Sequence, residues 1–171
     1  MPKLKSGSEL PFSEKKNKVG HVIMKTLTPM LYRRCQSHLM VMVLFVCTGN
    51  AARSQMAEGW LKSMKSGLTV VSAGTKPERL SSMAVKAMLE VGLNISDQTS
   101  KHLAKVPWEK ADYAITLCSS ANEECVNMNW PKTCTREHWP IEDPRSQEDF
   151  ENARDEIHKK IKDFLKSLQF V

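Results

Sequence analysis

The feature that most limits the fold is an uninterrupted apolar stretch, Met40–Val46, followed at once by a short polar segment, Cys47–Arg53. A strand that is covered on one face alternates apolar and polar residues, whereas a strand covered on both faces is apolar throughout. Strands of the second kind belong to parallel sheets with helices on both sides. We therefore expect an α/β domain with Met40–Val46 as a central strand.

The rest of the chain alternates between strand-like and helix-like patterns. Further strands are expected at Leu68–Ala73, Asp112–Leu117 and, with a weaker pattern, Thr135–Trp139. Helices are expected at Ser54–Lys65, Ser81–Val91 and Ser146–Leu168, with a short helical turn at Trp108–Lys110. Gly67 and Gly92 follow the first two helices, where glycine commonly ends a helix. This order predicts a mostly parallel sheet with helices on both faces.

The positive charge of the chain is confined to its start. The formal net charge is +6, and residues 1–39 contain eight Lys/Arg and two Asp/Glu, so the remainder is neutral. We interpret residues 1–39 as a basic, disordered extension or as sequence upstream of the true start, and residues 40–171 as the single domain. Nucleic-acid binding would depend entirely on residues 1–39, and we therefore disfavour a nucleic-acid-binding function. No apolar run approaches the roughly 20 residues that a membrane helix needs.

The five cysteines are an odd number in a chain without a clear signal peptide. A secreted disulfide framework is therefore disfavoured, and reduced thiols in the cytoplasm are expected. No CxxC pair is present, which disfavours a zinc site. We expect no metal and no cofactor. Cys35 and Cys134 match no catalytic pattern and are interpreted as incidental.

The segment Cys47-Thr48-Gly49-Asn50-Ala51-Ala52-Arg53-Ser54 lies between an expected strand and an expected helix. A short loop at this place can point several backbone N–H groups at an oxyanion, beside the positive end of the helix dipole. Arg53 can hold two oxygens of a tetrahedral anion, and Ser54 can donate a hydrogen bond to the Cys47 sulfur. The positive surroundings favour the thiolate of Cys47. The GxxxxGK[ST] pattern of nucleotide loops is absent. The alternative is a structural cysteine at a strand end.

Two further cysteines, Cys118 and Cys125, are placed so that they could take part in the chemistry of Cys47. Cys118 ends an expected strand as Cys47 does, so in a parallel sheet both would lie at the same edge. Cys125 follows Cys118 by seven residues, which is roughly 10.5 Å along a helix. A disulfide tolerates a Cα separation of about 7 Å, so pairing would require this segment to unwind or loop out. The segment is polar and expected to be poorly packed. Alternatively, Cys118 is a core residue and Cys125 is incidental.

The stretch VLFVCTGNAARSQMAEGW resembles the signature of the low-molecular-weight protein tyrosine phosphatase superfamily and, more narrowly, of the thioredoxin-coupled arsenate reductases. The similarity covers about residues 41–168. Further matching stretches are Val71–Thr75, Ile95–Ser100, Ile115–Ser119 with Cys125, Glu137–Pro144 and Arg154–Ile157. The resemblance implies a four-stranded parallel sheet flanked by helices on both faces, in agreement with the pattern of apolar residues.

The resemblance also implies a reaction, the reduction of arsenate to arsenite in arsenic detoxification. Cys47 would attack arsenate, Cys118 would then attack Cys47 and release arsenite, and Cys125 would form a disulfide with Cys118 that thioredoxin reduces. Asp143, in the loop before the last helix, matches a general acid or base; on its own, Asp143-Pro144 is equally a turn. Phosphate or sulfate would compete with arsenate. We expect a monomer.

One position departs from the pattern. Some reductases bind potassium through side chains matching Asn50, Glu58, Ser72 and Thr99 and an aspartate two residues after that threonine. Lys101 occupies the last position here. We hypothesise that its ammonium takes the place of potassium; the alternative is a solvated surface charge.

Two other functions remain open. A tyrosine phosphatase of the same superfamily would share the anion loop and Asp143. It needs aromatic walls, usually directly after the Asp-Pro pair, whereas Arg145-Ser146-Gln147 follows here and the next aromatic residue is Phe150. A non-enzymatic metalloid sensor, redox sensor or DNA-associated regulator is the third alternative, and the nucleophile, arginine and aspartate argue against it.

Overall fold

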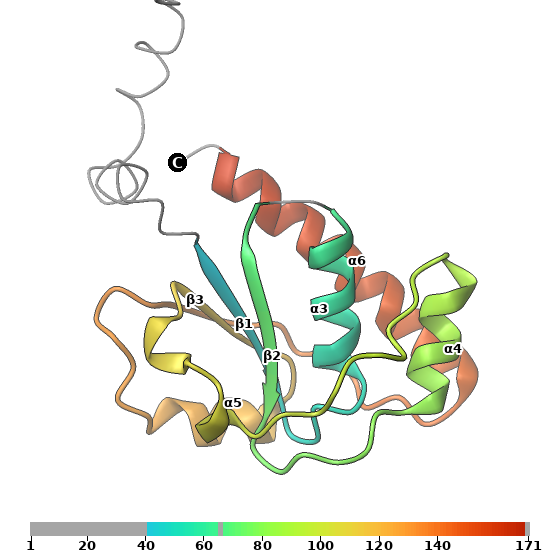
Figure 1. Cartoon of the computed structure of the whole chain (residues 1–171), viewed down its shortest axis with the longest axis horizontal. Helices are drawn as coiled ribbons and strands as arrows, with labels where there is room; N and C mark the ends of the chain where they lie inside the picture. The colour runs from blue at the N-terminus through green and yellow to red at the C-terminus, as the bar shows by residue number, and fades with distance from the viewer. Residues whose placement is uncertain (1–40, 65–66, 170–171) are drawn as a thin grey trace, which may run out of the picture.

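The computed structural model describes residues 41–64 and 67–169 of the chain. Its centre is a four-stranded sheet in which every neighbouring pair is parallel (Figure 1). The strands lie in the order β2-β1-β3-β4, with bounds Met42–Cys47 for β1, Thr69–Gly74 for β2, Tyr113–Thr116 for β3 and Thr135–His138 for β4. All residues of β1 are buried, which explains its uninterrupted apolar sequence. The predicted four-stranded parallel sheet is confirmed.

Helices cover both faces of the sheet. The α-helices are α3 (Arg53–Ser63), α4 (Ser82–Glu90), α5 (Ser119–Val126) and α6 (Gln147–Gln169), and the 3-10 helices are η1 (Leu103–Lys105) and η2 (Trp108–Lys110). Both α3 and α4 pack against α6 on one side, while α5 contacts β1 and β3 and lies apart from them across the sheet (Figure 1). In the described ranges no helix has the length and apolar character needed to cross a bilayer.

Most elements agree with the predicted ranges to within one or two residues, and the segment after Cys118 forms α5, for which no range was predicted. Two residues of α5, Ala121 and Cys125, are buried against the sheet. These residues are four apart, so they share one face of an otherwise polar helix. The other residues of α5 are exposed or half-buried, in agreement with the prediction of a polar, poorly packed segment. The short helix η1 was also not expected. The basic extension, residues 1–39, lies outside the described residues.

The long helix α6 joins the core through one apolar stripe. Phe150, Ile157, Ile161 and Phe164 are all buried, as the period of the sequence predicts. The ring of Phe164 lies 6.0 Å from that of Trp139, beyond the end of β4. This packing holds α6 against the residue that follows β4.

The sheet register places two cysteines at one edge. Val46 of β1 pairs with Thr116 of β3, so both strands end at the same level. Cys47 is the last residue of β1, and Cys118 follows β3 by two residues. The carboxyl edge of the sheet is therefore where the candidate site is built.

Candidate active site

The loop between β1 and α3 has its carbonyl groups turned outward. The carbonyl oxygens of Cys47, Thr48, Gly49 and Ala51 accept hydrogen bonds from the backbone N–H groups of Thr75, Lys76, Glu78 and Ser81, at 3.3, 2.9, 2.8 and 2.9 Å. In a planar trans peptide the C=O and the following N–H point in opposite directions. Fixing the carbonyls outward therefore turns the next N–H groups inward. Such a nest of N–H groups binds an anion.

Asn50 stabilises the loop through hydrogen bonds of its buried side chain. It is fully buried and has φ of +44°, an uncommon conformation for a residue with a side chain. Its side-chain Nδ2 donates to the hydroxyl oxygens of Ser54 (2.8 Å) and Ser72 (2.9 Å), and its Oδ1 accepts from the backbone N–H of Lys101 (2.7 Å). The side chain of Asn50 thus belongs to the scaffold, and only its backbone N–H faces the nucleophile.

The sulfur of Cys47 lies among hydrogen-bond donors. Cys47 is 2% exposed, with Sγ 2.9 Å from Ser54 Oγ and 3.2 Å from the backbone N of Asn50. The arrangement suits a nucleophile at the base of an oxyanion pocket.

The other two cysteines lie at the start and in the last turn of α5. Cys118 directly precedes the helix, and its Sγ lies 3.2 Å from Thr48 Oγ1, so it touches the loop directly. Cys125 is 4% exposed. Burial raises the pKa of the Cys125 thiol to about 11, assisted by the negative charge of Glu124 and by Cys118, while Arg136 acts in the opposite direction. Cys125 is therefore a protonated, shielded thiol in this conformation.

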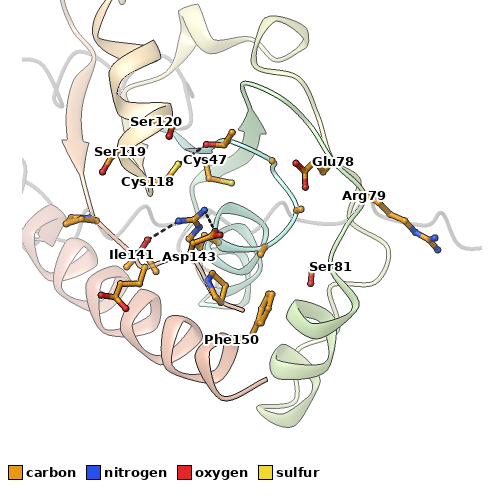
Figure 2. Close-up of a pocket in the computed structure, with 18 residues that line it drawn as sticks. Cys47, Glu78, Arg79, Ser81, Cys118, Ser119, Ser120, Ile141, Asp143 and Phe150 are labelled. Carbon is orange, nitrogen blue, oxygen red and sulfur yellow. Dashed lines mark hydrogen bonds and ion pairs between the residues drawn. The ribbon is translucent and has the colours of Figure 1, made fainter. Parts of the chain in front are cut away.

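Arg53 and Asp143 meet across the mouth of the site. Arg53 begins α3, and its guanidinium donates to Asp143 Oδ1 (2.6 Å) and to the carbonyl oxygen of Ile141 (3.0 Å). A cavity of about 820 Å³ lies above Cys47, and Figure 2 shows Cys47, Cys118, Asp143 and Phe150 around it. The lining also includes Thr48, Gly49, Ala51 and Ala52 of the loop. The structure thus brings the loop, both thiols and the acid together.

The supporting residues form a second group behind the loop. Glu58 is buried and accepts a hydrogen bond from the Ser72 hydroxyl, and its other carboxylate oxygen pairs with Lys62. Lys101 Nζ lies 3.4 Å from Glu58 Oε2 and donates to the carbonyl oxygen of Thr99 (2.9 Å). Thr99 contributes its backbone rather than its side chain, unlike the pattern implied by the resemblance. The Lys101 ammonium is therefore not a free surface charge.

Several contributing residues were not identified from the sequence. Gln55 and Ser100 donate to the Asn50 carbonyl oxygen, at 3.0 and 2.7 Å. Gly74 ends β2 so close to the loop that a Cβ there would lie 2.6 Å from the Thr48 carbonyl oxygen. Gly74 and Ser100 fall in the matching stretches, but nothing in their residue types reveals these contacts. Phe150 is predicted from the sequence as a core residue of the last helix, and α6 also places it in the cavity wall.

The chain is similar to known proteins of one family. Residues 42–170 match the family model described as low molecular weight phosphotyrosine protein phosphatase. Arsenate reductase 1 of Staphylococcus haemolyticus is 39% identical over 129 residues, covering 74% of this chain and 96% of its own length. Arsenate reductase of Brevibacillus brevis is 42% identical over 128 residues, covering 73% and 94%.

A solved structure described as an arsenate reductase in the phosphate binding state superposes with a TM-score of 0.64 at 33% identity, covering 75% of this chain and 98% of that one. The parallel sheet, the loop that begins at Cys47 and the matched length agree with one another. The chain belongs to the low-molecular-weight phosphotyrosine protein phosphatase family.

Proposed function

We propose that this protein reduces arsenate to arsenite with a relay of three thiols. The observation that carries the proposal is the contact between Cys118 Sγ and Thr48 Oγ1 (3.2 Å), which places a second thiol against the loop of the nucleophile. Cys125 on the same helix supplies a third. A hydrolytic phosphatase needs only the first thiol, whereas two-electron reduction needs a partner thiol.

In the first step the Cys47 thiolate attacks the arsenic of arsenate, and an S–As bond forms as one oxygen leaves as water. Asp143, paired with Arg53 at the mouth, is suited to protonate that oxygen. The inward N–H groups of the loop and the Arg53 guanidinium stabilise the negative charge. Phosphate and sulfate have the same tetrahedral shape, so they would compete.

In the second step the Cys118 thiolate attacks Cys47 Sγ. The S–As bond breaks with its electron pair passing to arsenic, which leaves as arsenite, and a Cys47–Cys118 disulfide remains. Cys125 then attacks Cys118, so Cys47 is released as a thiolate and a Cys118–Cys125 disulfide forms. The shielding of Cys125 supports its place as the last thiol, since a protonated thiol does not compete for arsenate.

The reductant that we propose is thioredoxin, because the relay ends in an intramolecular disulfide that a dithiol protein can reduce. We also propose a cytoplasmic location, where the free thiols of the described residues Cys47, Cys118, Cys125 and Cys134 would stay reduced. We propose a monomer that needs no metal or cofactor. In place of a bound potassium ion, the Lys101 ammonium neutralises Glu58 behind the loop.

The test is NADPH consumption in the presence of arsenate, thioredoxin and thioredoxin reductase. The parent protein should turn over continuously, and Cys125→Ser should stop after a single round. Cys134→Ser is the matched control and should leave turnover unchanged, because Cys134 directly precedes β4, at the amino end of the strand and away from the carboxyl edge that carries the site. Absence of arsenate turnover in the parent would refute the proposal.

One observation favours a second activity, hydrolysis of aryl phosphates. Phe150 lines the cavity, and about 820 Å³ is more than a single oxyanion occupies. This aromatic wall comes from α6 and not from the residues directly after Pro144. Hydrolysis of a small aryl phosphate that survives Cys125→Ser, together with no arsenate turnover, would favour the phosphatase.

A further inference from the structure

Thr75 contacts two parts of the site, the loop that begins at Cys47 and helix α5. Its backbone N–H donates to the Cys47 carbonyl oxygen (3.3 Å), and its hydroxyl donates to Glu124 Oε1 on α5 (3.1 Å). The ammonium of the neighbouring Lys76 lies 4.0 Å from the same oxygen. The short segment after β2 therefore contacts both the loop of the nucleophile and the helix that carries the other two thiols.

Glu124 immediately precedes Cys125 in the last turn of α5. A second contact fixes this turn from the other side, since the Trp130 indole donates to the carbonyl oxygen of Cys125 (2.8 Å). Trp130 is itself packed against Trp108, with ring centroids 5.4 Å apart. Cys125 lies between these two attachments and is 4% exposed.

We propose that Thr75 and Glu124 form a clasp that holds the last turn of α5 closed over Cys125 and opens when Cys125 attacks Cys118. The functional meaning of the clasp rests on the proposed thiol relay. In that step Cys125 loses its proton to solvent and bonds to Cys118 Sγ, while the Cys47–Cys118 bond breaks and Cys47 leaves as a thiolate. No further oxidant or reductant is needed.

The geometry explains why the clasp must open. Seven residues of helix separate Cys118 from Cys125 by roughly 10.5 Å, whereas a disulfide tolerates about 7 Å between Cα atoms. Cys118 is held to Cys47 by a disulfide at this stage of the proposed relay, so the turn that carries Cys125 is the part that leaves its helical position, and Glu124 leaves with it. Thr75 stays, because its backbone is bonded to the Cys47 loop. Thr75 is thus a positioning residue, which acts on the relay through Glu124.

The test measures how fast iodoacetamide modifies each cysteine of the reduced, full-length protein, read by mass spectrometry. Thr75→Val removes the hydroxyl and keeps the shape of the side chain, so Cys125 should react about threefold faster, as expected for a contact near the surface. Thr75→Ser keeps the hydroxyl and should restore the parent rate. Cys134, which directly precedes β4, serves as the internal reference, and its rate should not change.

Glu124→Ala should accelerate Cys125 more than Thr75→Val does, because it removes the contact and also a negative charge beside the thiol. Glu123→Ala, an exposed neighbour on the same helix, is the matched control and should have no effect. In the Glu124→Ala background, Thr75→Val should add nothing, since its partner is already gone.

Three results would overturn the clasp: an unchanged Cys125 rate in Thr75→Val, a Thr75→Val effect that persists in the Glu124→Ala background, or an equal acceleration of Cys134, which would indicate general loosening. The assay contains neither arsenate nor thioredoxin. A parent protein that fails to reduce arsenate would therefore refute the proposed function without touching this measurement.

Discussion

Arg53 Nη2 lies 2.6 Å from Asp143 Oδ1, so the arginine expected to hold an oxyanion is already paired with the carboxylate expected to protonate it. The Arg53 side chain is 12% exposed and that of Asp143 is 69% exposed, which places the carboxylate at the mouth and the guanidinium inside. An incoming oxyanion must compete with Asp143 for the guanidinium. In the proposed reaction the same aspartate therefore opposes anion binding and assists the proton transfer.

Asp143→Asn separates these two effects. The neutral amide pairs less strongly with Arg53, so phosphate should bind several-fold more tightly, while arsenate turnover should fall by about 10²-fold or more because the proton donor is lost. Calorimetric titration with phosphate and steady-state kinetics measure the two quantities. Weaker phosphate binding in the variant would show that the ion pair does not compete with the anion.

Gly74→Ala should damage the anion loop specifically. The new Cβ would lie 2.6 Å from the Thr48 carbonyl oxygen and 2.8 Å from the Asn50 backbone N, so the loop must shift. Because a displacement of about 1 Å can reduce activity roughly 10²-fold, phosphate affinity and turnover should both fall steeply.

Gly92→Ala is the control for this substitution. Gly92 has φ of +78° and nothing within 4 Å of an added Cβ, so alanine there strains the backbone without touching the site. It should lower the free energy of unfolding by about 1 kcal/mol and leave phosphate affinity intact. Equal losses of affinity in both variants would contradict the close-approach explanation.

Lys101 should make activity independent of potassium. Its ammonium pairs with Glu58 and donates to the Thr99 carbonyl oxygen, so the cation of this group is supplied by the chain. Turnover should be the same in KCl and NaCl at equal ionic strength. Lys101→Gln should lower the free energy of unfolding by about 1 kcal/mol, because Lys62 and Ser72 still serve the Glu58 carboxylate. Clear activation of the parent by potassium would defeat the hypothesis.

His158 should make stability depend on pH. Its ring stacks on Trp60 with centroids 3.8 Å apart, and burial lowers the pKa of His158, assisted by Lys162 and partly opposed by Asp155. The folded state therefore favours the neutral ring. This contribution is fully present above the unfolded pKa of about 6.5 and is lost as pH falls through the lower folded value.

The measurement is urea unfolding at pH 7.5 and at pH 5. His158→Phe keeps an aromatic ring against Trp60 and removes the titration, so its stability should change less between the two pH values than that of the parent. An identical change in both proteins would assign the pH dependence to other groups.

The predictable elements of the fold are those in which burial produces a recognisable apolar pattern in the sequence. The strand β1 is buried on both faces and reads as a continuous apolar run, and α6 shows its stripe from Phe150 to Phe164. Helix α5 buries only Ala121 and Cys125 in eight residues, too few for its packing to be inferred. The helix without a predicted range is therefore the one with the shortest apolar stripe.

The residues of the site also divide into those that the sequence predicts and those that it does not. Cys47, Arg53 and Ser54 are identifiable because their chemistry depends on side chains at fixed spacing, and Asp143 and Lys101 were identified through family resemblance. The hydrogen bonds that hold the loop's carbonyl groups outward are donated by the backbone N–H groups of Thr75, Lys76, Glu78 and Ser81. Almost any residue could supply such a group. Gly74 is required by contact with a segment 26 residues earlier, and local sequence carries no trace of that contact.

The pairing of β1 with β3 has a consequence for how such a protein can evolve. Hydrogen bonds hold the ends of these strands in register, so the distance between Cys47 and the start of α5 is set by the sheet and not by the surface. In the proposed relay, substitutions on the exposed side of α5 would alter which reductant docks, while oxyanion selection at the loop would stay as it was. Electron supply and substrate choice would then be separately adjustable traits of one small domain.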